Sequence, residues 1–341
     1  MRLAGPKTGL SQIFQVKITP LLGLLSFWSS LFGYEAKMRV VDETGAPVQG
    51  VNVAIEFTAA RQEQSVTYHG TTGKDGTFSA QGQSLLEVYM EAKKLGHYDS
   101  RVYGLSPKKD HDLVITIPRV LSPGPLYAIR ANPGIPVQNE WLGYDFASAD
   151  WIAPYGKGKI ADILFRFKNQ FKGYDDSVRN LRDEIASSKR GYAARKEEWT
   201  EEKFKRDAGK WDAELEISFP GDKEGLFEEA RFLAFSRLKL PHAAPEEGYV
   251  STWRYTSKTY SPPTARDNVG FFVRSRVKLD AKGKIVSANY AKIVGDIYCA
   301  ATGVLRFTYY YNPRANDRNL EFDPKRNLFA KDKPGANVSD P

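Results

Sequence analysis

The sequence predicts a mainly β protein built from two β-sandwich domains, the second of which is larger and carries a helical insert. Two observations support this fold class. Short segments in which apolar and polar residues alternate recur along most of the chain, as in half-buried strands, and turn residues separate them at short intervals. A single stretch, residues 174–210, has helical spacing instead. With 341 residues, the chain is long enough for two domains of ordinary size.

The first domain is predicted at residues 34–119. Residues 51–57 and 86–90 alternate apolar and polar side chains, and residues 113–117 form a last strand before Pro118. The dipeptide Asp75-Gly76 is a strong signal for a tight turn. Several short strands at this spacing indicate a small antiparallel sandwich.

Turn motifs in this domain resemble those of a known family. The frame Val-x-Asp-x-x-Gly-x-Pro-Val-x-Gly-Val-x-Val occupies residues 40–53, Thr-x-Lys-Asp-Gly-x-Phe occupies residues 72–78, and Gly-His-Tyr follows at 96–98. The segment resembles the carboxypeptidase regulatory-like, transthyretin-like β-sandwich over about 85 residues. That resemblance implies an accessory or binding module of an exported bacterial protein, and it carries no catalytic residue onto this chain.

The second domain is predicted at residues 120–330, after the Pro- and Gly-rich break at residues 121–125. It contains strand patterns at five places and one helical region, residues 174–210, in which Glu201–Lys205 and Glu202–Arg206 are favourable i,i+4 pairs. The strand patterns are residues 160–167, 211–219, 269–279, 284–297 and 304–311. The polar tail, residues 331–341, is predicted to be disordered. Residues 151–162 and 307–323 resemble parts of a set of uncharacterised exported bacterial proteins, and this resemblance implies no activity.

The N-terminus predicts export. Residues 1–17 hold three basic residues and no acid, and a short apolar stretch from Ile18 to Gly33 follows. This is the pattern of a secretory signal peptide, predicted here as residues 1–33. The apolar stretch is shorter than the ~20 residues of a membrane-spanning helix, so the protein is expected in the periplasm or outside the cell, without a membrane span after cleavage. An uncleaved signal anchor is the alternative.

Composition excludes several classes of site. The net charge of +8 is spread along the chain without a basic stripe, so no nucleic-acid partner is expected. One cysteine excludes an intrachain disulfide. No cofactor, metal site or catalytic residue is predicted. Asp317, Asn319, Glu321 and Asp323 alternate like half of a calcium loop but lack its glycine, so a capped turn is the alternative.

Aromatic residues are the leading candidates for binding. They make up 13% of the chain, and several lie near Pro- and Gly-rich loops. Flat aromatic rings stack on the apolar faces of sugars, and the candidate ligand-binding residues are Trp151, Tyr155, Trp253 and Tyr255. Packing of these rings in the sandwich core is the competing interpretation.

We therefore expect a non-catalytic binding or scaffolding protein of the bacterial envelope, with a cell-surface glycan or an envelope protein as its partner. One alternative is a hydrolase acting on cell-surface polysaccharide or protein, for which Asp162, Asp212 and Asp296 could supply inward-facing carboxylates. A second alternative is an accessory subunit of an envelope assembly.

Overall fold

The computed structural model describes residues 33–59, 65–174, 178, 180–258, 266 and 268–341. The predicted signal peptide, apart from Gly33, lies outside the described residues. The predicted fold class is confirmed, because the chain is mainly β, with four sheets and two α-helices among the described residues. The described residues divide into two compact units, the first formed by those up to residue 94 together with 101–115 and the second by residues 95–100 and those from 116 onward.

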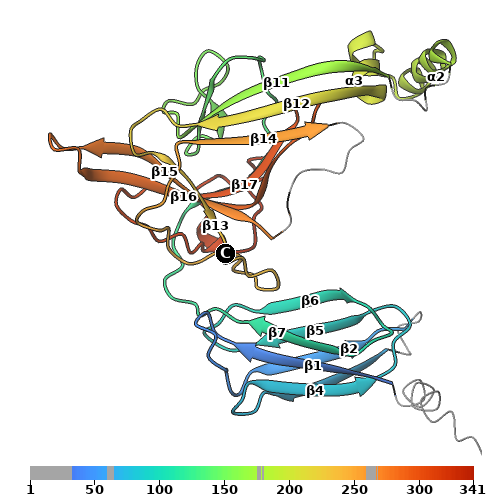
Figure 1. Cartoon of the computed structure of the whole chain (residues 1–341), viewed down its shortest axis with the longest axis vertical. Coiled ribbons are helices and arrows are strands. Elements are labelled where there is room, and N and C mark those ends of the chain that lie inside the picture. Colours follow the sequence, from blue (N-terminus) through green and yellow to red (C-terminus); the bar gives the residue numbers. More distant parts are fainter. Residues whose placement is uncertain (1–32, 60–64, 175–177, 179, 259–265, 267) are drawn as a thin grey trace, which may run out of the picture. The chain divides into compact units, whose positions relative to one another are not determined.

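The first unit is a sandwich of a three-stranded and a four-stranded sheet, drawn in blue to teal in Figure 1. The strand orders are β4-β1-β7 and β3-β2-β5-β6. The strands are β1 (Tyr34–Val41), β2 (Asn52–Phe57), β3 (Val66–Thr71), β4 (Thr77–Gly82), β5 (Val88–Lys93), β6 (Ser100–Leu105) and β7 (His111–Thr116). Alternate residues of these strands, such as Met38, Ile55 and Met90, are fully buried and form the core.

The turn motifs of this unit have local structural roles. The Asp42 carboxylate accepts hydrogen bonds from the backbone N–H groups of Thr44 and Ala46. Thr72 donates its hydroxyl to the Val48 carbonyl and accepts from the Val51 N–H. Gly76 has a φ of +75°, and a Cβ there would lie 2.5 Å from a carbonyl oxygen, so only glycine fits the Asp-Gly turn.

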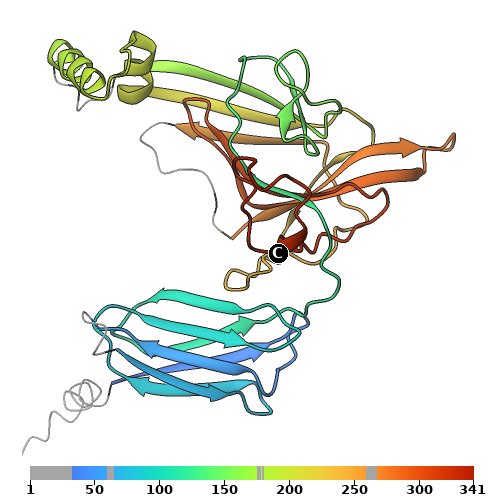
Figure 2. The same ribbon diagram turned by 180° about the vertical axis from the view of Figure 1, so that it is seen from behind.

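The second unit packs two five-stranded sheets face to face (Figure 2). The first sheet has the order β10-β9-β11-β12-β14 and the second β13-β15-β16-β17-β8. The strands are β8 (Tyr127–Ala131), β9 (Leu142–Asp145), β10 (Asp150–Trp151), β11 (Ile163–Tyr174), β12 (Gly209–Ser218), β13 (Gly225–Glu229), β14 (Thr252–Lys258), β15 (Gly270–Leu279), β16 (Ile285–Cys299) and β17 (Leu305–Asn312). Aromatic rings meet between the sheets, as in the edge-to-face pair of Trp253 and Phe271 at 5.7 Å.

The helical insert joins β11 to β12 at the far end of a long hairpin (Figure 1). It contains α2 (Leu181–Ala194) and α3 (Glu201–Ala208). The Thr200 hydroxyl caps α3 by accepting from the Lys203 N–H at 3.1 Å. The predicted Glu201–Lys205 pair is present at 2.8 Å, whereas Arg206 pairs with the neighbouring Asp207 instead of Glu202.

The C-terminal tail differs from its prediction. The structure places residues 331–341 against the second sheet, and Ala336 and Val338 are buried there. The Gly335 carbonyl accepts a hydrogen bond from the Arg130 N–H of the edge strand β8, and the Asp340 carbonyl accepts from the Tyr310 hydroxyl. The prediction of a disordered tail is wrong, because a few small apolar residues and the free hydrogen-bonding groups of an edge strand are enough to hold a mostly polar segment.

Candidate functional site

The outer face of the first sheet of the second unit carries rows of charged side chains. Alternation along β11 and β12 turns Phe165 and Ile217 into the core, and therefore turns Arg166 and Glu216 outward. The strand register places Arg166, Glu216 and Arg254 side by side on three neighbouring strands. Lys168, Glu214 and Thr256 form the next row along the same strands. We call these six residues the outer face.

Glu216 is the centre of this outer face. Its carboxylate accepts hydrogen bonds from Arg166 Nε and, at 2.8 Å, from Arg254 Nη2, and Lys168 Nζ lies 3.6 Å away. The hydrogen bond from Arg166, reinforced by that from Arg254, lowers the pKa of Glu216 to about 2. The carboxylate is therefore ionised at neutral pH and offers no proton to a reaction. Its role is to hold two guanidinium groups in a fixed row.

Trp141 provides an aromatic surface at the end of this row. It directly precedes β9, and its side chain is 42% exposed. The Arg166 guanidinium carbon lies 4.6 Å from the centre of the Trp141 ring, a cation–π contact that fixes the ring in place. A hollow of about 470 Å³ is lined by Trp141 together with Arg166, Glu216, Ile217, Thr252, Trp253 and Arg254. The hollow thus combines an exposed ring with fixed donors and acceptors.

A second hollow lies farther along the same strands. Its volume is about 350 Å³, and its lining comprises Lys168, Asn169, Gln170, Asp212, Ala213, Glu214 and Thr256. Together, the two hollows offer an extended polar surface with one exposed tryptophan at one end. A chain of sugar units needs a surface of this kind, with polar groups for the hydroxyls and a ring for an apolar sugar face.

Two of the four sequence-predicted residues are core residues. Trp151 is 5% exposed, makes edge-to-face contacts with Tyr144 and Phe165, and donates its indole N–H to the Gly134 carbonyl at 2.8 Å. Tyr255 is 4% exposed and belongs to the core between the sheets. At this level of burial both rings pack mainly in the core, as the competing interpretation expects, although Trp151 also lines a pocket of about 550 Å³.

The other two predicted residues are accessible. Trp253 stacks on Tyr255 with ring centres 6.0 Å apart, is partly exposed, and lines the 470 Å³ hollow. Tyr155 is 41% exposed and donates its hydroxyl to Glu140 Oε2 at 3.1 Å. Because Glu140 directly precedes Trp141, this hydrogen bond links the Tyr155 loop to the segment that carries the exposed tryptophan.

Trp141 belongs to the same group of aromatic residues near Pro- and Gly-rich loops as the four candidates, but it is not one of the predicted site residues. The available signal is its position. Trp141 directly precedes Leu142, whose side chain is buried, so strand alternation turns Trp141 outward. The charged row of Arg166, Glu216 and Arg254 could not be predicted, because it depends on the pairing of strands that lie far apart in the sequence.

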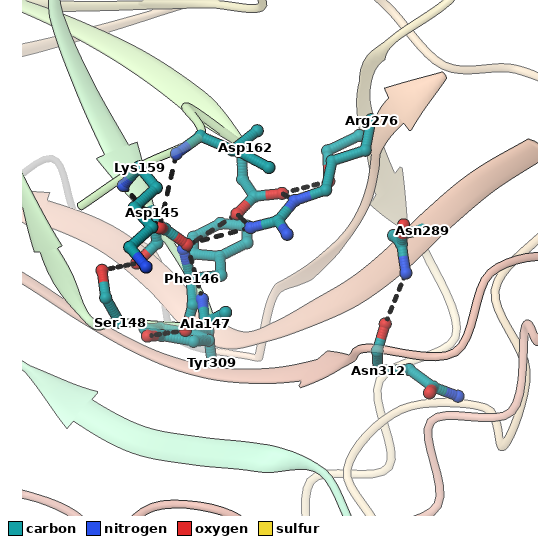
Figure 3. Close-up of polar contacts among 12 residues, drawn as sticks. Asp145, Phe146, Ala147, Ser148, Lys159, Asp162, Arg276, Asn289, Tyr309 and Asn312 are labelled. Carbon is teal, nitrogen blue, oxygen red and sulfur yellow. Dashed lines mark hydrogen bonds and ion pairs between the residues drawn. The ribbon is translucent and has the colours of Figure 1, made fainter. Parts of the chain in front are cut away.

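A buried acid pair exists elsewhere in this unit (Figure 3). Asp162 accepts hydrogen bonds from the Ser275 hydroxyl, the Phe146 N–H and two nitrogens of Arg276, at 2.6–2.9 Å. Asp145 accepts from Arg276 and from the N–H groups of Ala147 and Lys159 at 2.9 Å.

The pKa values of these two carboxyls move in opposite directions. Burial raises the pKa of Asp162, whereas backbone N–H donors and Arg276 outweigh burial and lower that of Asp145. Opposed shifts are a feature of acid–base pairs in enzymes. However, Asp162 is fully buried and Asp145 is 4% exposed, and protein donors occupy their oxygens. The pair is therefore enclosed away from substrates and acts as a link between the sheets.

The alternating acids near the C-terminus bond to the protein itself. Asp317 accepts from the Asn319 N–H, and Asn319 accepts from the Glu321 N–H. The Glu321 carboxylate accepts from the Leu121 N–H, the Ser122 N–H and the Tyr98 hydroxyl. Asp323 caps the 3₁₀ helix η2 (Pro324–Arg326) by accepting from the Lys325 N–H. Within the described part of the chain, no group of three or more His, Cys, Asp or Glu side chains is arranged to hold a metal ion.

Comparisons with known proteins give no family. No protein-family model matches the chain, and no curated protein matches it in sequence. Among solved structures, a streptococcal ancillary pilin is 12% identical over 32% of this chain and 38% of its own, with a TM-score of 0.19. A candidate carbohydrate-binding protein from Bacteroides uniformis is 10% identical over 83% of this chain and 98% of its own, with a TM-score of 0.20. The TIE protein of Bacillus anthracis is 8% identical over 85% of this chain and 49% of its own, with a TM-score of 0.20. These similarities are too weak to support a functional conclusion.

The two helices that the structure describes, α2 and α3, are short and mostly polar. Neither of them is long and apolar enough to cross a bilayer.

Proposed function

We propose that this protein is exported and binds an extracellular or cell-surface glycan without catalysing a reaction on it. The first unit acts as an accessory β-sandwich of the carboxypeptidase regulatory-like kind, and the second unit carries the binding surface. Export to the periplasm or beyond is supported by the basic and apolar segments at the N-terminus. The seven strands of the first unit, in sheets of three and four, are compatible with the proposed family.

One observation carries the binding proposal. Trp141 is exposed, is held in place by Arg166, and lies beside a row of charged groups that Glu216 keeps ordered. An aromatic ring with fixed polar neighbours matches a sugar, which has an apolar C–H face and hydroxyls at its edge. Because Glu216 accepts hydrogen bonds from two arginines and is ionised, it suits hydroxyl binding better than proton transfer.

Co-sedimentation tests this proposal. The protein from Tyr34 onward is mixed with insoluble cell-wall and polysaccharide fractions at low and high salt concentrations. Retention that persists at high salt is the expected result, since stacking on an aromatic ring is not screened by ions. Retention that disappears at high salt would assign the binding to the net positive charge of the protein. Absence of retention at both salt concentrations would reject the glycan and favour an envelope protein as the partner. Release of sugar products would favour the alternative of a hydrolase.

A further inference from the structure

Another pocket in the same unit is lined by cationic side chains. Its volume is about 550 Å³, and it is lined by residues of β15 and β16, of the turn between them, and of the segments before β13, before β14 and after β17. Four cations line it, namely Lys223, Arg274, Lys284 and Arg318. The acids in its lining are Glu246 and Glu247, so the lining carries two positive charges in excess. The pocket shares no lining residue with the hollow beside Trp141.

Arg274 is the fixed part of this pocket. Its side chain extends from β15, the residue is only 8% exposed, and its guanidinium carbon lies 4.3 Å from the centre of the Tyr249 ring. Nε donates to the Lys223 carbonyl at 2.7 Å and Nη1 to the Glu246 carbonyl at 2.8 Å. Nη2 makes no hydrogen bond to any residue that the structure describes. A buried, oriented guanidinium with free donors on one nitrogen is arranged to receive an oxyanion.

The other charges of the pocket differ in how far they are neutralised. Arg318 pairs with Glu246 at 2.7 Å, so these two charges largely cancel. Lys284, at the hairpin turn before β16, is exposed, and its ammonium has no ion pair within the described residues. An incoming anion would thus meet Arg274 at the base and Lys284 at the mouth. Tyr290, which is mostly buried and lines the same pocket, adds an aromatic wall.

We propose that this pocket binds the carboxylate of an acidic sugar residue, such as a uronic acid. The inference rests on the proposed glycan-binding function, and it names the class of sugar. A carboxylate can accept from the free nitrogen of Arg274 and attract Lys284, while the sugar ring contacts Tyr290 and fills space that a small inorganic ion leaves empty. A cavity of about 550 Å³ lies in the usual size range of small-molecule sites.

Binding of trigalacturonate, measured by isothermal titration calorimetry on the protein from Tyr34 onward, tests this proposal. The fully methyl-esterified trisaccharide is the matched probe, because it keeps the rings but lacks the charges. Lys284→Ala removes the cation at the mouth, and Lys282→Ala on the same turn is the matched control, since Lys282 is exposed but does not line the pocket. Arg274→Gln, checked for folding by circular dichroism, removes the central cation.

The expected result is binding of the acidic trisaccharide and none of the ester. Lys284→Ala should weaken binding about threefold, as for an exposed ion pair, and Arg274→Gln at least about tenfold, as for a hydrogen bond to a charged group. Lys282→Ala should have no effect. Equal binding of acid and ester, an unchanged Kd in Lys284→Ala, or equally tight binding of inorganic phosphate would overturn the proposal. Trp141→Ala separates the two sites, because it should reduce retention on polysaccharide and leave trisaccharide binding unchanged.

Discussion

Arg276 in β15 and Asp162, which directly precedes β11, join the two sheets of the second unit through two hydrogen bonds of 2.8 Å each. The backbone of Arg276 lies in the left-handed region, with a φ of +52°, where the β15–β16 register shifts between Ser275 and Lys278. A bulge of this kind redirects a side chain that would otherwise follow the strand alternation. Figure 3 shows the guanidinium pointing to both Asp162 and Asp145.

This link predicts a large effect of Asp162→Asn on stability. The substitution removes the fully buried one of the two anionic partners of Arg276, and breaking a buried pair in this way costs about 3–5 kcal/mol. Urea unfolding measures the free energy of unfolding of each variant. Asp212→Asn is the control, because Asp212 pairs with Lys172 at 3.6 Å on the exposed side of the sheet, where an ion pair contributes about 0–1 kcal/mol. Equal losses of unfolding free energy in the two variants would contradict the role of Asp162 in linking the sheets.

The burial of Lys292 in β16 leads us to predict an unusual dependence of stability on pH. Its side chain is fully buried, its ammonium nitrogen lies 4.7 Å from the centre of the Tyr310 ring, and this nitrogen has no hydrogen-bond partner among the described residues. Burial lowers the pKa of Lys292 to about 7, against the smaller opposing effect of Glu321. In the unfolded chain the pKa is about 10.4.

Between these two pKa values the unfolded state binds more protons than the folded state, so stability should rise with pH from about 7 to about 10. Lys292→Met fills the same space without a charge and should be more stable than the wild type at pH 7. This advantage should shrink by about 2–3 kcal/mol between pH 7 and pH 9. Urea unfolding at both pH values checks this. An advantage that is independent of pH would show that Lys292 does not titrate in this window.

The position of the C-terminal tail predicts a specific effect of Gly335→Ala. Gly335 has a φ of +85°, and a Cβ there would lie 2.4 Å from the Arg130 carbonyl oxygen of β8. Gly295→Ala is the matched control, because Gly295 has a φ of +82° but no atom within 4 Å of its Cβ position. In both variants the left-handed backbone conformation of an alanine costs about 1–2 kcal/mol. Gly335→Ala should lose more stability than Gly295→Ala, because its Cβ also clashes with the Arg130 carbonyl oxygen. Equal thermal stabilities would contradict the contact between the tail and β8.

The sequence predicts the helical insert and the five longest strands of the second unit, because their signals are local, but it does not predict β8, β9, β10, β13 and β14. Alternation at residues 211–219 indicates the strand β12, and the spacing of residues 174–210 indicates helix. Features that depend on contacts between distant segments could not be predicted. The row of Arg166, Glu216 and Arg254 depends on the strand register. The link from Arg276 depends on a bulge with a positive φ, which no local sequence motif indicates. For the same reason the sequence indicates Trp151 and Tyr255 as ligand-binding residues, although both are buried in the fold.

The central claim is tested most directly by asking whether the Trp141→Ala variant is still retained on a polysaccharide that retains the wild-type protein. Co-sedimentation is measured at high salt, with Tyr103→Ala as the control, since Tyr103 is 63% exposed and lies on β6 of the first unit. Loss of one stacking ring should weaken binding by about 1 kcal/mol or more, or roughly fivefold, while Tyr103→Ala should bind like the wild type. Unchanged retention of Trp141→Ala would contradict the assignment of this sheet face as the glycan site.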